Sequence, residues 1–109
     1  MESPLRQRTD ADLHQAFIRL HVLHHAAEEP VYGLWMIEEL KRHGYRAGPG
    51  TLYPIFHGLE ARGYLRSNTV RSADGRHRRF YRATAAGRRA LVAAKVKLRE
   101  LADELFAHD

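Results

Sequence analysis

The sequence predicts a mainly α-helical domain that carries a small two-stranded β-hairpin, in a chain of 109 residues. Two observations lead to this fold class. Apolar residues recur at intervals of three and four in four separate stretches, the spacing of amphipathic helices. Between the third and fourth stretches the period shortens to two, and the pair Asp74-Gly75, which is typical of a hairpin turn, interrupts it. An apolar content of 44% suffices for one domain with one modest core.

The first predicted helix starts near Leu13 and has apolar residues over most of its circumference. Thr9 or Asp10 is placed to cap it, so residues 1–9 are expected to form a flexible N-terminus. A helix with so wide an apolar stripe is expected to lie between other elements. The positions that define the stripe are Leu13, Ala16, Leu20, Leu23 and Ala27.

A second helix is predicted for residues 32–43, ending at Gly44. A turn-forming stretch follows, and Thr51 is placed to cap a third helix that runs to about Arg62. With this start Pro54 falls in the first helical turn, where its missing N–H has no partner to lose.

The hairpin is predicted to have two strands of about six residues each. Strands this short are marginal by themselves, so we expect the hairpin to pack on the helical core. The expected contacts are Leu65, Val70, and either Phe80 or Tyr81.

Thr84 is placed to cap a last helix, and its apolar positions form a seam over two heptads. The seam residues are Leu91, Ala94, Leu98, Leu101 and Leu105. Such a seam requires a partner helix, so residues 84–109 are predicted to be a dimerisation helix. We expect the seam to close with help from the first helix of one or both subunits.

Three helices followed by a hairpin are the element order of a winged helix-turn-helix, to which we assign residues 10–83. In this fold the third helix enters the major groove of DNA and the hairpin, or wing, contacts the backbone or minor groove. Residues 62–89 contain nine arginines and one acid, in a chain whose net charge is +5. Such a one-sided charge favours phosphate binding, although arginines on a hairpin can also serve to keep a strand edge from aggregating.

Several other classes of protein are disfavoured. The chain has no cysteine, no apolar stretch long enough for a membrane span and no apolar segment typical of a secretion signal, so we expect a cytoplasmic protein without a membrane partner. It also lacks a nucleophile motif and a glycine-rich phosphate loop, so we do not expect an enzyme. An adaptor that binds another protein through the leucine seam stays open as an alternative.

Three stretches of the sequence resemble the PadR family of transcriptional regulators. They are VYGLWMIEEL at 31–40, GTLYPIFHGLEARGYL at 50–65 and RFYRATAAG at 79–87, and they occur in the family's order and spacing. The resemblance implies a homodimer that binds an inverted repeat in double-stranded DNA, usually as a repressor, and that responds to a small effector molecule. The short C-terminal part is similar to the subgroup with a single dimerisation helix.

The resemblance also implies which residues contact DNA. Thr51 and Tyr53 lie at the start of the recognition helix. Gly58 stands where similar proteins often carry a basic residue, and we expect His57, the residue before it, to contribute a contact instead. The alternative for Tyr53 is a ring in the core. The expected contacts of the wing are Arg71, Arg76, Arg78 and Arg79. Some short members hold flat ligands near an aromatic residue of the last helix, where this chain has only Phe106, at the end of the helix.

Eight histidines are present, and four of them lie in the first predicted helix. His21 and His25 are one turn apart, and Glu29 follows one turn later, a spacing that would let them share a divalent metal ion. The chain could therefore be a metal-responsive regulator, although no cofactor is required for DNA binding. A pH-sensitive dimer contact and simple solvent exposure are the alternatives for these histidines.

Overall fold

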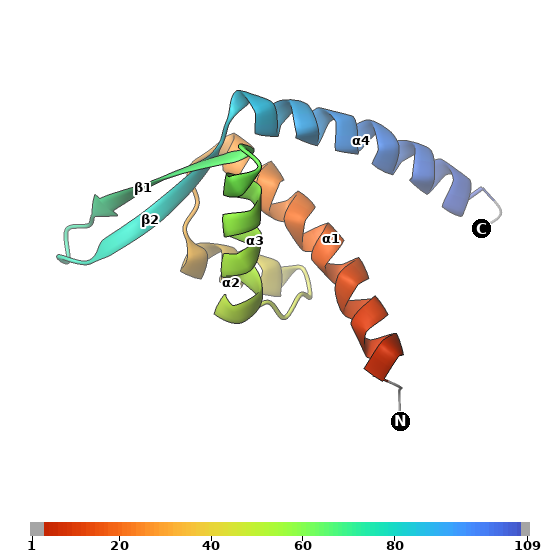
Figure 1. Ribbon diagram of the computed structural model, residues 1–109, viewed down its shortest axis with the longest axis horizontal. Coiled ribbons are helices and arrows are strands. Elements are labelled where there is room, and N and C mark those ends of the chain that lie inside the picture. The colour runs from red at the N-terminus through yellow and green to blue at the C-terminus, as the bar shows by residue number, and fades with distance from the viewer. Residues whose placement is uncertain (1–3, 108–109) are drawn as a thin grey trace.

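The computed structural model describes the backbone of residues 4–107 and the side chains of residues 11–107. Within this range it contains four helices and one hairpin, which confirms the predicted fold class (Figure 1). The hairpin projects from one end of the helical body, whereas α1 and α4 diverge toward the two termini. The elements are α1 (Pro4–Glu28), α2 (Gly33–Arg42), α3 (Pro49–Ala61), β1 (Leu65–Arg71), β2 (His77–Ala83) and α4 (Ala85–Leu105).

Helix α1 begins at Pro4, well before the start predicted from its apolar stripe. Thr9 and Asp10 therefore lie inside the helix and do not cap it. A proline is well tolerated in the first turn of a helix. No proline or glycine follows until Pro30, so the helix can continue without interruption from Pro4 to Glu28. Residues 4–9 thus belong to α1 and not to a separate segment, and residues 1–3 lie outside the described part of the chain.

Helix α2 agrees with its prediction to within one residue, and Gly44 follows it with a φ of +87°. Helix α3 starts earlier than predicted, with Gly48 as its N-cap, so Thr51 is not the cap. The backbone N–H of Thr51 instead donates to the carbonyl of Gly48 at 3.1 Å. Pro49, whose fixed φ suits the first helical position, accounts for the earlier start. Pro54 consequently lies inside α3, and the carbonyl of Gly50 loses the N–H that would normally bond to it.

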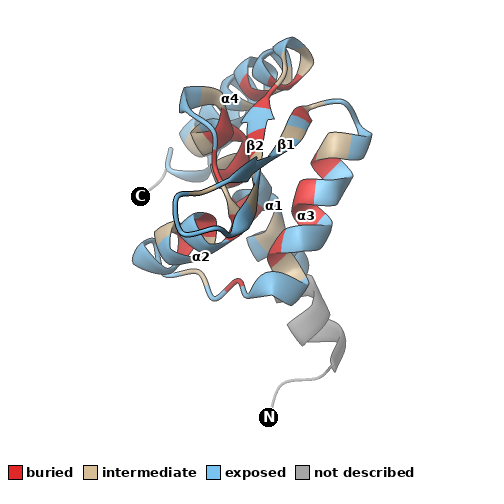
Figure 2. Ribbon diagram, turned by 90° about the vertical axis from the view of Figure 1, so that its left-hand side faces the viewer, coloured by how far each residue is buried: buried red, intermediate tan, exposed pale blue. Residues whose placement is uncertain are grey.

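The core lies where α1, α2 and α3 meet the base of the hairpin, and Figure 2 shows buried positions on all of these elements. Its centre is a pair of parallel rings, Phe56 of α3 and Tyr81 of β2, whose centroids are 4.1 Å apart. The other fully buried large side chains are Val22, Met36, Leu40 and Leu52. The ring pair joins the hairpin to α3.

Strands β1 and β2 pair antiparallel, from Leu65 opposite Ala83 to Arg71 opposite His77. Leu65 and Tyr81 are buried at the base of the hairpin, as predicted. The prediction for Val70 was wrong: it is exposed, because it pairs near the outer end of the hairpin, beyond the helical body. Phe80 is half-buried and packs against the ring of Tyr32.

Asp74 organises the turn between the strands. Its carboxylate accepts hydrogen bonds from the Ser72 hydroxyl and from the backbone N–H of Arg76, the latter at 3.0 Å. These bonds, that of Ser72 first, lower the pKa of Asp74. Gly75 takes a φ of +83°, which glycine adopts without strain. The turn therefore presents Arg76 in a defined backbone conformation.

Two further contacts hold the hairpin on the helices. Val31 and Tyr81 exchange backbone hydrogen bonds of 2.9 and 2.7 Å, which extends the sheet by one bridge at the α1–α2 link. On the other strand, Glu60 of α3 accepts a hydrogen bond from the backbone N–H of Ser67 at 3.1 Å. The wing is thus held to the helices through both of its strands.

Helix α4 begins at the predicted cap, because the Thr84 hydroxyl oxygen accepts the N–H of Gly87 at 3.0 Å and its O–H donates to the carbonyl of Gly63 at 2.5 Å. The predicted seam divides into two parts. Leu91 belongs to the core of its own chain and Ala94 is half-buried, because the first half of α4 packs on α1. The exposed part of the seam consists of Leu98, Leu101 and Leu105.

Candidate nucleic-acid interface

The outward face of α3 carries few polar side chains. Tyr53 and His57 lie one turn apart on this face, with ring centroids 6.4 Å apart. The exposed residues next to them are Pro54, which follows Tyr53, and Gly58, which follows His57. Tyr53 is 39% exposed, so its ring is not a core ring. Tyr53 and His57 are therefore the hydrogen-bonding side chains that this face offers to a base edge.

The ring of Tyr53 lies across the start of α2. A Cβ at Gly33, the first residue of α2, would stand 2.3 Å from the Tyr53 hydroxyl oxygen. The N-cap of α2, Tyr32, makes no side-chain hydrogen bond to the first turn among the described residues. Uncapped N–H groups at a helix N-terminus favour an anion such as a phosphate.

A groove of about 250 Å³ joins these features to the wing. One wall is formed by Tyr53 and the start of α2, and the other by the outer part of β2. The guanidinium carbon of Arg78 lies 4.7 Å from the ring centroid of Tyr32, and this cation–π contact connects the two walls. The residues that line the groove are Tyr32, Gly33, Leu34, Tyr53, Arg76, His77, Arg78 and Arg79.

The structure thus brings together four of the predicted DNA contacts, Tyr53 and the arginines at 76, 78 and 79. Thr51 lies on another side of α3, in a hollow that it shares with Arg19 of α1. Arg71 is exposed at the outer end of β1, and His57 is exposed one turn beyond Tyr53. All seven predicted contacts lie on α3 or the wing, and six of them, all except Thr51, are exposed or line the groove.

Sequence reasoning missed two residues of this surface, Tyr32 and Arg19. Tyr32 was visible only as part of a family motif, and nothing in its spacing indicated a contact with an arginine some 46 positions later. Arg19 interrupts the apolar stripe of α1, and only the packing of α1 beside α3 places it near Thr51. Both contacts are tertiary, so periodicity within one helix could not reveal them.

We predict that Gly33→Ala weakens DNA binding and leaves most of the stability intact. The new Cβ would overlap the Tyr53 hydroxyl, and the ring can move away because it is the far end of a side chain. Tyr53 would then leave its place in the groove. We expect a loss of about tenfold in affinity for duplex DNA, measured by fluorescence anisotropy, which corresponds to ~1.4 kcal/mol. Gly33→Ala combined with Tyr53→Ala should bind no more weakly than Tyr53→Ala alone, and a further loss would contradict this explanation.

The histidines of α1 form a second cluster, at the contact with α2. His21 and His25 lie one turn apart, with nearly parallel rings 6.1 Å apart. The predicted third member, Glu29, is exposed and is not part of the cluster, because α1 ends at Glu28 and the chain turns away. Its place is taken by His43, which follows the last residue of α2.

Burial lowers the pKa of both His21 and His25. The neighbouring imidazoles lower it further, those of His43 and His24 most strongly, whereas the nearby carboxylate of Glu39 raises it. Both imidazoles are thereby favoured in their neutral form.

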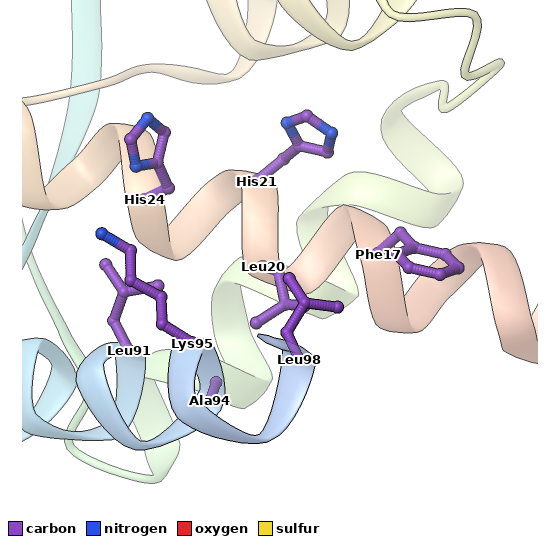
Figure 3. A pocket seen from close by; sticks show the side chains of 8 residues that line it. All are labelled: Phe17, Leu20, His21, His24, Leu91, Ala94, Lys95 and Leu98. Carbon is purple, nitrogen blue, oxygen red and sulfur yellow. The ribbon is translucent and has the colours of Figure 1, made fainter. Parts of the chain in front are cut away.

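A third feature is an apolar hollow of about 240 Å³ between α1 and α4. Figure 3 shows Leu91 and Leu98 projecting from α4 toward α1, with Phe17 at the side of the hollow. Phe17 supplies an aromatic wall that α4 itself lacks. The remaining residues that line it are Leu20, His21, His24, Ala94 and Lys95.

Comparison with known proteins decides which functional class this geometry belongs to. The family model described as "Transcriptional regulator PadR-like family" matches residues 22–93, from α1 through the wing to the first half of α4. The chain belongs to the PadR family. The curated protein "Transcriptional regulator Rv3488" of Mycobacterium tuberculosis is 55% identical to it over 95 residues, which cover 87% of this chain and 88% of that protein.

Solved structures of PadR proteins share the fold. A PadR family transcriptional regulator from Eggerthella lenta has a TM-score of 0.78 and 28% identity, covering 93% of this chain and 88% of that one. A PadR-like regulator from Bacillus cereus has a TM-score of 0.75 and 21% identity, covering 83% and 88%. The winged-helix prediction is confirmed, and the chain is a transcriptional regulator and not an enzyme. Within the described residues, no helix is long and apolar enough to cross a membrane.

Proposed function

We propose that this PadR-family regulator binds an inverted-repeat operator in double-stranded DNA as a homodimer and acts as a repressor. The observation that carries the proposal is the groove in which Tyr53 of α3 faces the arginines of the wing. A phosphate held in this groove would meet the uncapped start of α2 on one side and guanidinium groups on the other. The DNA partner is also the basis for our expectation of a cytoplasmic location.

The proposed roles of the two parts differ. The exposed face of α3 offers only two hydrogen-bonding side chains, so direct reading of bases would depend on Tyr53 and His57. The wing supplies guanidinium groups, which grip phosphate oxygens in pairs. We therefore expect the wing to provide most of the affinity and α3 to position the protein on a sequence whose shape fits.

A second copy of the chain is the proposed partner of the exposed seam on α4. Leu98, Leu101 and Leu105 continue the stripe that begins with the buried Leu91, and the exposed ring of Phe17 on α1 lies beside Leu98. Leu13, one turn earlier on α1, is exposed as well. A stripe of this kind on a symmetric dimer buries the same residues of both subunits. A small effector that entered the hollow between α1 and α4 would lie next to this contact, and could alter the spacing of the two wings.

The triple variant Arg76→Ala, Arg78→Ala, Arg79→Ala tests the proposal. We expect weaker binding to every duplex sequence, because phosphate contacts carry no sequence information. The slope of log affinity against log salt concentration should become shallower by about 0.9 for each phosphate that the variant no longer neutralises. Fluorescence anisotropy at several salt concentrations, with a pool of random duplexes and with an operator selected from it, gives both quantities.

A matched control removes three exposed positive charges outside the groove, in Lys41→Ala, Lys97→Ala, Arg99→Ala. Its net charge equals that of the test variant, so it should reproduce only the general electrostatic loss. Equal losses of affinity and of salt slope in the two variants would contradict the proposed interface.

A further inference from the structure

Three histidines from two helices meet at the contact between α1 and α2. A ring nitrogen of each of His21, His25 and His43 lies within 4.8 Å of one on both others. The rings of His21 and His43 are 4.9 Å apart between centroids. In a tetrahedral site with metal–nitrogen bonds of about 2.0–2.1 Å, the nitrogens stand about 3.3 Å apart. Small rotations about the side-chain bonds would bring the three imidazoles to that separation.

The carboxylate of Glu39 faces this group from α2. Its Oε2 lies 3.2 Å from Nε2 of His43 and 3.6 Å from Nε2 of His25. The Glu39 side chain is only 11% exposed, although Arg42 contacts its other oxygen at 3.2 Å. A largely buried carboxylate beside imidazoles can orient them or complete a coordination shell, and its charge offsets part of that of a dication.

We propose that His21, His25 and His43 bind a divalent transition-metal ion, with Glu39 as the carboxylate that orients them or ligates with them. An all-imidazole set without cysteine suits Zn²⁺, Co²⁺, Ni²⁺ or Cu²⁺, whereas Ca²⁺ and Mg²⁺ prefer oxygen.

A second arrangement uses residues of α1 alone. His24, His25 and Glu28 also lie within ligand distance of one another, and Nε2 of His24 is 2.7 Å from the Glu28 carboxylate. Two of these three side chains are exposed to water, whereas two of the three histidines in the proposed site are half-buried. The interhelical site is therefore the better pre-organised of the two, and His24 provides the means to tell them apart.

Binding can be followed through Trp35, the only tryptophan in the chain. Its ring lies edge-on to that of His25, with centroids 5.3 Å apart. Titration with Zn²⁺ should change its fluorescence, and calorimetry gives the affinity independently. Co²⁺ gives a visible absorption spectrum that reports a four-coordinate site.

We expect His43→Gln to weaken Zn²⁺ binding by at least about 100-fold and Glu39→Gln by about 10–100-fold, the range seen for carboxylates that orient metal ligands. His24→Gln and His77→Gln should each change the affinity by less than about threefold. His43 is exposed, so its variant should remain folded, and circular dichroism without metal checks this. If His24→Gln loses binding while His43→Gln keeps it, or if the wild type does not bind Zn²⁺ at micromolar concentration, the proposed site is wrong.

The site also has a regulatory consequence that rests on the proposed function. The ion would join α2 to α1. The start of α2 borders the proposed DNA groove, and α1 packs against α4, which carries the seam. Wild-type protein should then change its affinity for operator DNA on addition of Zn²⁺, and His43→Gln should not. Metal binding without any effect on DNA affinity would overturn this regulatory role and leave the site standing, whereas failure of the apo protein to bind DNA would contradict the proposed function itself.

Discussion

Replacing Gly87 by alanine is expected to lower the free energy of unfolding by about 3 kcal/mol, the upper end of the usual cost of overpacking. A Cβ at this position would stand 2.1 Å from the carbonyl oxygen of Tyr64 and 3.0 Å from its carbonyl carbon. Both are backbone atoms, which cannot swing aside as a side chain can. The start of α4 would have to move away from the turn before β1.

That movement would strain the hydrogen bonds that fix α4 in place. Thr84 donates its N–H to the Tyr64 carbonyl at 3.0 Å and its hydroxyl to Gly63, and it accepts the N–H of Gly87. The loss is a large part of the 5–15 kcal/mol that stabilises a typical domain. Urea unfolding followed by circular dichroism at fixed protein concentration measures it, and the melting temperature should fall by on the order of 10–20 °C.

Gly58→Ala is the matched control for this prediction. Gly58 is also a helical glycine, in α3, but a Cβ there would meet no atom within 4 Å among the described residues. Alanine should therefore stabilise the protein, by up to ~1 kcal/mol, through its higher helix propensity. Equal destabilisation by both substitutions would show that the close approach to Tyr64 is not the cause.

Leu101→Asp is expected to convert the proposed dimer to a folded monomer. Leu101 is 50% exposed in the single chain, so an aspartate there faces water in a monomer. In a dimer the same carboxylate would be buried against the partner helix without a counter-ion, which is strongly unfavourable. Light scattering measures the mass, and circular dichroism should show an unchanged helix content.

The change should also remove most of the affinity for an inverted repeat. Two linked winged-helix domains gain about 10²–10⁴ in apparent affinity over one, because the second domain binds in an intramolecular step. A monomer loses this factor. Half-sites should be bound about equally by variant and wild type. In the intact dimer we expect the two α3 helices to lie roughly 34–36 Å apart, one turn of DNA, which solution scattering can test.

Val96→Asp provides the comparison, since Val96 is exposed on α4 to a similar extent but lies off the heptad seam. It should remain a dimer. A wild-type protein that is monomeric, or a Leu101→Asp variant that stays dimeric, would contradict the seam as the dimer contact.

The fold class, the order of the elements and the hairpin followed from the sequence because each depends on local chemistry. Each of these signals depends only on residues that are close together in the sequence. They are the three-and-four spacing of apolar residues, the glycines at 44 and 75, and the helix cap at Thr84. The predicted starts of α1 and α3 were wrong, because other local signals act there. At α3 the pair Gly48-Pro49 outweighed Thr51, and α1 extends back to Pro4.

The sequence by itself also placed the positive charge in the wing and the apolar seam on the last helix. Only the tertiary structure decided which of these residues meet. It turned Tyr53 toward the wing by packing α3 on the start of α2, left Val70 outside the core, and assigned Leu91 to its own chain. It also replaced Glu29 with His43 and Glu39 in the histidine cluster. The physical reason is the same in each case. The spacing of side chains in the sequence shows which residues share one face of a helix. It does not show which distant element packs against that face.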